Sequence, residues 1–392
     1  MISFLDPSDL KGDLDSWPSL AERSWKDFTS IPKLPDNVEG IVLAGMGGSG
    51  IAGDLICDIS AEKSSKLMLF TNKDYHLPKW VDGRFALVAI SCSGNTEETL
   101  SVVAEARARG IECFGIGSGG LLKKFAQEKW NFPFIQTGML KVPRTSLPAL
   151  FFPLVKLFSE NSILKVDQED LDDCFNSLNK VKELSGKLKN LRSNPSFEIA
   201  QQLASNEDRL LIYSSRRTRA VGLRFRQSLN ENAKMHAFNG EIPELCHNDI
   251  VGWDLQDSRI QDIGEKSKRL VSTKSAEKRK RRSFAAEGHS SSKAAPSNGL
   301  ALLLRLREDD PEEIRVRFDV VSDVIRRRNG IRIIAPYFGK SFIARTFSML
   351  YSLEYSTYFA AVLRGINPIL TPSIDLLKKE MTRKLGFVGR IS

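Results

Sequence analysis

The sequence predicts an α/β fold of two domains, each a mostly parallel sheet flanked by helices. Its 392 residues are long enough to bury two hydrophobic cores. Short apolar runs ending in glycine or serine alternate with segments of helical periodicity, which is typical of parallel sheets. This alternation occurs on both sides of a polar helical stretch. We therefore expect an N-terminal domain over 1–160, a helical connection over 161–205 and a C-terminal domain over 206–392.

The expected strands of the first half are short and apolar, and glycine-rich or polar residues follow them. They cover residues 39–45, 66–72, 85–94 and 112–120. Between the last two, NTEETLSVVAEARARG has helical periodicity and ends at Gly110, a residue suited to a helix C-terminus.

The second half repeats the pattern. Strands are expected over 208–215, 301–308 and 331–339, and a helix over 217–234. The apolar C-terminal segment SFIARTFSMLYSLEYSTYFAAVL is interrupted by Arg345 and Glu354, which favours a buried helix over a membrane span.

Composition narrows the class of protein. The five cysteines are scattered and form no C-x-x-C pair, and the chain has four histidines. A disulfide framework or a metal site is therefore not expected, and a reducing cytoplasm suits the chain. The first residues, MISFLDPSDLKGDLDSWP, are mixed and acidic, unlike a signal peptide.

The net charge of +9 is concentrated in one segment. Residues 265–293 hold ten Lys and Arg against three Glu, a balance of +7, and the remainder of the chain accounts for +2. We interpret the polar stretch at about 264–299 as a solvated basic insertion. Nucleic-acid or membrane partners are therefore not expected.

The stretch IVLAGMGGSGIAGDL contains Gly45-x-Gly47-x-x-Gly50, which has the spacing of a dinucleotide-binding loop. Such a loop also needs an acidic residue at the end of the next strand. In FTNKDYH, Thr71 and Asn72 occupy that place and Asp74 follows a lysine. The match to a dinucleotide site is poor.

A compact phosphomonoester suits these loops better. Glycines let backbone N–H groups approach an anion, small hydroxyls donate hydrogen bonds, and a helix N-terminus favours negative charge. The expected phosphate-binding residues are Gly47, Gly48, Ser49, Ser91, Ser93 and Thr96.

The paired loops GMGGSGIAGDL and SCSGNTEETL resemble those of the sugar isomerase (SIS) domain family. VPRTSLPALFFPL, LNENAKMHAFNGEIPELCHNDIVGW and GINPILTPSIDLLKKEM resemble one branch of it, the bifunctional phosphoglucose/phosphomannose isomerases of archaea and bacteria. The resemblance implies two SIS-type domains. It also implies interconversion of glucose 6-phosphate, and of mannose 6-phosphate, with fructose 6-phosphate through a cis-enediol, without metal or redox cofactor.

The same resemblance assigns roles to residues of these segments. Glu231 matches the catalytic base, and Arg144 matches the arginine that stabilises enediolate charge. His247 matches a ring-opening histidine that the family delivers from the neighbouring subunit, which implies a homodimer with shared active sites. His236, five residues after Glu231, is a rival for this role but sits outside the matching position.

Two further assignments come from the C-terminal segment. Lys378 matches a lysine that assists ring opening, although the adjacent Lys379 could be confused with it. Thr371 matches the hydroxyl associated with acceptance of both C2 epimers.

Two other functions remain open on the residues alone. A non-catalytic sugar-phosphate sensor would use the same loops and would bind without turnover. It would need only the anchors, whereas Glu231, His247, Arg144 and Lys378 occur together. An isomerase of amino-sugar phosphates would need an ammonia source that the sequence does not supply.

Overall fold

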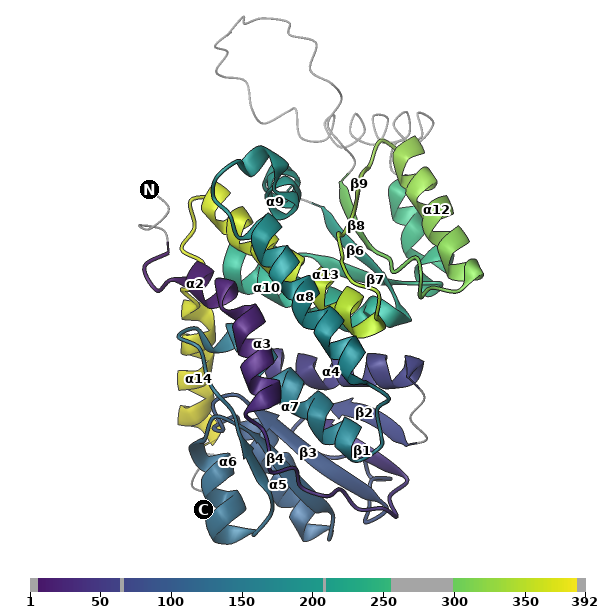
Figure 1. Cartoon of the computed structure of the whole chain (residues 1–392). Helices are drawn as coiled ribbons and strands as arrows, with labels where there is room; N and C mark the ends of the chain where they lie inside the picture. Colours follow the sequence, from purple (N-terminus) through teal and green to yellow (C-terminus); the bar gives the residue numbers. More distant parts are fainter. Residues whose placement is uncertain (1–5, 64–66, 207–208, 255–298, 386–392) are drawn as a thin grey trace, which may run out of the picture.

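A computed structural model describes residues 6–63, 67–206, 209–254 and 299–385. The expected basic insertion at 264–299 lies outside the described residues, apart from Gly299. The described chain forms two separate parallel sheets with helices around and between them (Figure 1). This confirms the predicted α/β fold with two sheet-containing halves.

The first sheet has the strand order β2-β1-β3-β4-β5, and every neighbouring pair is parallel. Its strands are β1 Gly40–Ala44, β2 Met68–Asn72, β3 Phe85–Ser91, β4 Glu112–Gly117 and β5 Phe134–Gln136. β1 and β3 are buried along their whole lengths, as expected for apolar strands covered on both faces. The sequence reading missed β5, a three-residue edge strand.

The second sheet has the order β7-β6-β8-β9 and is also parallel throughout. Its strands are β6 Leu210–Ser215, β7 Phe238–Ile242, β8 Leu300–Leu304 and β9 Ile331–Ile334. The sequence reading missed β7 because FNGEI is polar and lies at the edge of the sheet. β8 and β9 end before the expected 308 and 339, since the strand pairing stops where the chain turns away.

Helices cover both sheets. The first half contains α2 Leu10–Asp15, α3 Trp17–Lys26, α4 Gly47–Glu62, α5 Glu97–Ala108, α6 Gly120–Lys124 and α7 Leu147–Glu160. The second contains α8 Gln168–Ser185, α9 Pro195–Ser205, α10 Arg219–Ser228, α12 Glu312–Arg327, α13 Phe342–Leu363 and α14 Pro372–Leu385. Gly110, with φ of 72°, follows α5 as predicted. Of the helices described, none combines the length and apolar character needed to cross a bilayer.

The helices of the expected connection are part of the packed core. α8 and α9 both contact α13, a helix that is buried over nearly all of its length. Ser196 at the start of α9 donates a hydrogen bond to the Ser352 carbonyl at 2.7 Å. Because these contacts are extensive, residues 161–205 do more than link the two halves.

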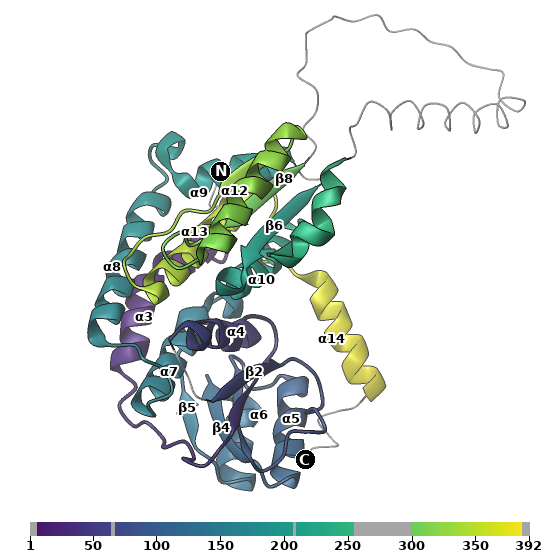
Figure 2. The same cartoon turned by 90° about the vertical axis from the view of Figure 1, so that its right-hand side faces the viewer.

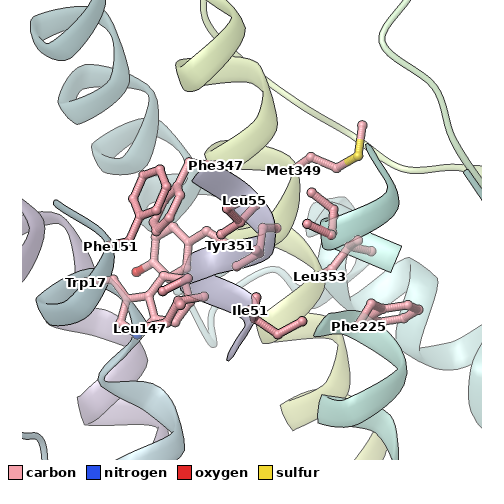
Figure 3. Close-up of a cluster of buried hydrophobic side chains, with 14 of the residues drawn as sticks. Trp17, Ile51, Leu55, Leu147, Phe151, Phe225, Phe347, Met349, Tyr351 and Leu353 are labelled. Carbon is pink, nitrogen blue, oxygen red and sulfur yellow. The ribbon is translucent and has the colours of Figure 1, made fainter. Parts of the chain in front are cut away.

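One hydrophobic core joins elements of both halves (Figure 3). Trp17 stacks on Tyr351 of α13 with ring centroids 5.0 Å apart, and Phe151 of α7 stacks on Phe347 at 4.7 Å. The Trp17 indole N–H donates to the Thr145 carbonyl at 2.8 Å. The turn that contains Arg144 is therefore anchored directly to this core.

A buried ion pair crosses the same region. Arg224 of α10 and Glu354 of α13 are each 1% exposed, and Arg224 Nε lies 2.7 Å from Glu354 Oε1. Ser228 Oγ donates to the same carboxylate oxygen at 2.6 Å. Arg224 Nη2 also donates to the Arg144 carbonyl at 2.8 Å. The pair thus fixes α10, α13 and the Arg144 turn relative to one another.

We expect Glu354→Leu to lower the free energy of unfolding by about 3–5 kcal/mol, because it leaves the buried Arg224 guanidinium without its counter-charge. Urea denaturation of the native and variant chains measures this change. The double variant Arg224→Met/Glu354→Leu is the control and should recover most of the lost stability, since neither charge remains buried. A single variant as stable as the native chain would contradict the role given to this pair.

Candidate functional site

The first glycine loop brings the N-terminus of α4 to the carboxyl end of β1. Gly47 has φ of +52°, a conformation that favours glycine. A Cβ on Gly50 would lie 2.5 Å from the Gly45 carbonyl oxygen, and one on Gly45 would lie 2.7 Å from the Ile90 carbonyl oxygen. The glycines are therefore required for close backbone packing at this turn.

The second loop touches the first. The Cys92 N–H donates to Ser49 Oγ at 3.1 Å, so the two loops are linked directly. Ser91 Oγ and Thr96 Oγ1 lie 2.9 Å apart, and the Asn95 N–H donates to Ser93 Oγ at 3.2 Å. The structure therefore gathers the expected phosphate-binding residues on two adjoining loops, each leading into a helix N-terminus. Backbone N–H groups, hydroxyls and helix dipoles together can bind a phosphate.

Arg144 lies beside these loops on a short turn, η2 Pro143–Thr145. The Cys92 thiol donates to the Pro143 carbonyl at 3.7 Å, which connects the turn to the second loop. Arg144 Nε donates to Asn232 Oδ1 at 2.9 Å, and Nη2 donates to the Pro368 carbonyl at 2.6 Å. Burial lowers the pKa of Arg144, and the nearby Glu231 opposes this effect.

Glu231 lies on a wide π-turn, η5 Leu229–Ala233, that continues α10. Turns of this kind are frequent at functional sites. Its carboxylate Oε2 lies 3.3 Å from Arg144 Nε, and the side chain is 25% exposed. The adjacent Asn232 is buried and donates to Thr357 Oγ1 at 2.9 Å, which holds the turn against α13. The sequence-predicted pair of Glu231 and Arg144 is thus brought into contact.

Glu231 lines a pocket of about 390 Å³ between the π-turn and the start of α14. The predicted residue Thr371 also lines this pocket. The full lining is Asn230, Glu231, Lys234, Met235, His236, Leu370, Thr371, Pro372, Ser373 and Ile374. Its volume falls in the range of small-molecule sites.

Three predicted residues lie away from this pocket. His247 ends a short exposed turn, η6 Glu244–His247. Lys378 and Lys379 lie in the exposed part of α14, a helix that stands apart from the rest of the chain (Figure 2). None of the three lines the pocket that holds Glu231, whereas the rival His236 does. Arg144 and the predicted phosphate-binding residues of the two loops do not line this pocket either.

The sequence reading missed the residues that support the site. Arg224 and Glu354 hold the Arg144 turn, Asn232 positions Arg144, and Lys234 shares the pocket with Glu231. Glu354 was the available signal, since a lone acid inside a buried apolar helix implies a buried partner. In the sequence, Glu354 was interpreted only as a charge that argues against a membrane span.

A family model described as bacterial phospho-glucose isomerase C-terminal SIS domain matches residues 192–381. The match begins inside the expected connection.

Relatives also match over most of the chain. The chain is 31% identical over 341 residues to a bifunctional phosphoglucose/phosphomannose isomerase of Thermoplasma volcanium, covering 87% of the chain and 91% of the relative. It is 28% identical over 362 residues to the protein of the same name from Aquifex aeolicus, covering 92% and 94%.

Among solved structures, tagatose-6-phosphate ketose/aldose isomerase from Escherichia coli has the same fold. The TM-score is 0.62 at 14% identity, with 92% of this chain and 95% of that chain covered.

We expect Gly50→Ala to lower the free energy of unfolding by about 1–3 kcal/mol, because the new methyl group meets the Gly45 carbonyl. The displaced loop should also bind inorganic phosphate about tenfold more weakly or worse. Urea denaturation and titration calorimetry measure the two effects. Gly83→Ala is the matched control, since a Cβ there meets nothing within 4 Å. Native phosphate affinity in Gly50→Ala would show that the loop does not bind the anion.

Proposed function

The chain belongs to the bifunctional phosphoglucose/phosphomannose isomerase family, and we propose that it interconverts glucose 6-phosphate and mannose 6-phosphate with fructose 6-phosphate. The observation that carries this proposal is the contact between Arg144 and Glu231, the carboxylate that lines the pocket. A carboxylate and a fixed guanidinium are the groups that an aldose–ketose isomerisation needs.

The phosphate of the substrate binds at the two adjoining loops. The N-termini of α4 and α5 provide N–H groups and favourable dipoles, and the loop hydroxyls donate further hydrogen bonds. The anchoring set is Gly47, Gly48, Ser49, Ser91, Ser93 and Thr96. Binding energy from this remote group positions the carbon atoms that react.

Glu231 moves the proton between C1 and C2 of the open-chain sugar. Its carboxylate removes the C2 proton of the aldose, the C1–C2 double bond forms, and negative charge develops on the C1 oxygen. Arg144 stabilises that charge, because its guanidinium is held by Asn232 and the Pro368 carbonyl before the substrate reacts. Once the proton of the C2 hydroxyl has moved to the C1 oxygen, return of the carbon-bound proton from Glu231 to C1 gives the ketose.

In this proposal His247 and Lys378 open the sugar ring. The hydroxyl of Thr371 allows both C2 epimers, glucose 6-phosphate and mannose 6-phosphate, to be substrates. His247 protonates the ring oxygen or deprotonates the C1 hydroxyl, and Lys378 assists. This role of Thr371 is supported by the fact that it lines the same pocket as Glu231.

A homodimer with shared active sites explains the exposed positions of His247 and Lys378. Close to His247, a groove of about 620 Å³ runs between Cys246, Ile250 and α12. Val316 and Val320 of α12, both lining this groove, are 53% and 56% exposed. α14 carries exposed apolar side chains as well, Leu376 and Leu377. Apolar surfaces of this kind mark association sites, and a second copy is the partner proposed here.

A cytoplasmic location belongs to the same proposal. All five cysteines are unpaired thiols. Burial raises the pKa of Cys57 and of Cys113 to about 12, so these thiols resist oxidation. Unpaired thiols suit a reducing compartment.

We expect Glu231→Gln to lower turnover of glucose 6-phosphate and mannose 6-phosphate by about 100-fold or more, because the amide cannot accept the C2 proton. Fructose 6-phosphate formation is measured with EDTA present. Glu183→Gln is the control, since Glu183 is an exposed glutamate of α8. A native chain that binds glucose 6-phosphate without converting it would favour the sensor instead.

The shared active site predicts complementation between two inactive variants. Glu231→Gln and His247→Ala chains, unfolded, mixed equally and refolded, should regain about a quarter of native turnover, because half of the dimers then contain one intact site. Each variant refolded alone is the control. A mixture that stays as inactive as its components would show that His247 does not come from the partner subunit.

A further inference from the structure

Lys234 lies at the same wall of the pocket as Glu231, and its ammonium is held in place. Nζ donates to the Glu231 carbonyl at 2.5 Å and to the Pro368 carbonyl at 3.2 Å. Arg144 Nη2 donates to that same Pro368 carbonyl at 2.6 Å. Two cationic side chains therefore converge on one backbone oxygen, next to the carboxylate of Glu231.

The charges around Lys234 adjust its acidity. Lys234 is exposed as a residue, but its ammonium is partly desolvated where it meets the two carbonyls. This partial desolvation and the positive charge of Arg144 lower the pKa of Lys234 to about 8, while Glu231 acts in the opposite direction. An amine with this pKa can both donate and accept a proton near neutral pH. Arg144 cannot, because a guanidinium keeps its proton. Besides Glu231 and Lys234, His236 is a titratable side chain that lines this pocket.

The backbone of Lys234 is unusual. Its φ is +54° and its ψ is 41°, the left-handed conformation that favours glycine. A lysine in this conformation is strained, and strained residues gather at functional sites. Its N–H closes the π-turn by donating to the Leu229 carbonyl. The turn that carries Glu231 therefore also determines the direction of the lysine.

We infer that Lys234 is a further catalytic residue, which transfers a proton between the two oxygen atoms of the enediol. This inference rests on the proposed isomerase function. When Glu231 takes the C2 proton, the C1 carbonyl oxygen gains negative charge, and the Lys234 ammonium protonates it to give the cis-enediol. The neutral amine then removes the proton of the C2 hydroxyl. As the C2 carbonyl forms, C1 takes the proton from Glu231, and both side chains return to their starting states.

This assignment separates the work of the two cations. Arg144 stabilises the developing charge without exchanging protons, and Lys234 moves the proton that the two oxygens must share. Glu231 exchanges protons only with carbon. The three groups lie close enough to act on one C1–C2 unit, since all are linked through Pro368 or through direct contact.

The decisive variant is Lys234→Gly, because glycine adopts the left-handed backbone without strain. We expect its melting temperature to equal or exceed that of the native chain, while kcat for glucose 6-phosphate falls about 100-fold with little change in KM. The kcat of Lys234→Arg should be about as low as that of Lys234→Gly, since arginine keeps the positive charge but cannot exchange the proton. Lys189→Gln, at an exposed lysine, is the control.

The pH profile supplies a second readout. The kcat of the native chain should be highest below about pH 8 and should fall above it, as the Lys234 ammonium loses its proton. This alkaline limb should disappear in Lys234→Arg. A native kcat in Lys234→Gly, or an unchanged limb in Lys234→Arg, would overturn the inference and leave His236 as the group to test. Absence of turnover in the native chain itself would instead overturn the proposed function.

Discussion

The ion pair between Arg224 and Glu354 is the interaction on which the site depends. Burying two charges is expensive, and a pair of this kind contributes little net stability. Its contribution is to fix the positions of α10, α13 and the Arg144 turn relative to one another. Arg224 reaches from α10 to Glu354 of α13 and to the Arg144 carbonyl, so three segments distant in sequence have one arrangement that satisfies both charges. The π-turn with Glu231 begins directly after α10.

The same guanidinium also lies close to the first glycine loop. A Cβ on Gly48 would lie 3.5 Å from Arg224 Nη1, and this nitrogen is buried with no hydrogen-bond partner in the described structure. Because the charge of Arg224 is balanced by Glu354, the feature that matters here is a hydrogen-bond donor without a protein partner beside the N-terminus of α4. The residue that holds the Arg144 carbonyl thus also lies beside the first glycine loop.

The local elements could be predicted because their causes are local. β1 and β3 are continuous apolar runs, and Gly110 follows α5 in a left-handed conformation. β5 and β7 were missed because each is short or polar, and their strand pairing is supplied by the neighbours β4 and β6. The part of the chain from 161 to 205 was expected to link the two halves, but α8 and α9 pack on α13. Hydrophobic periodicity shows that a helix has a buried face, but it does not show which helix packs against that face.

The sequence by itself determined the α/β class and the two glycine- and serine-rich loops, and through family resemblance it singled out Glu231 and Arg144 as candidate catalytic residues. Only the tertiary structure decided that these two side chains touch, that Arg224 and Glu354 hold the Arg144 turn, and that Lys234 shares a pocket with Glu231. The physical reason is the distance along the chain between the residues that interact. Hydrophobic periodicity and glycine conformations act between near neighbours in the chain, whereas a hydrogen bond from Arg144 to Pro368 spans 224 positions and exists only once both halves have packed.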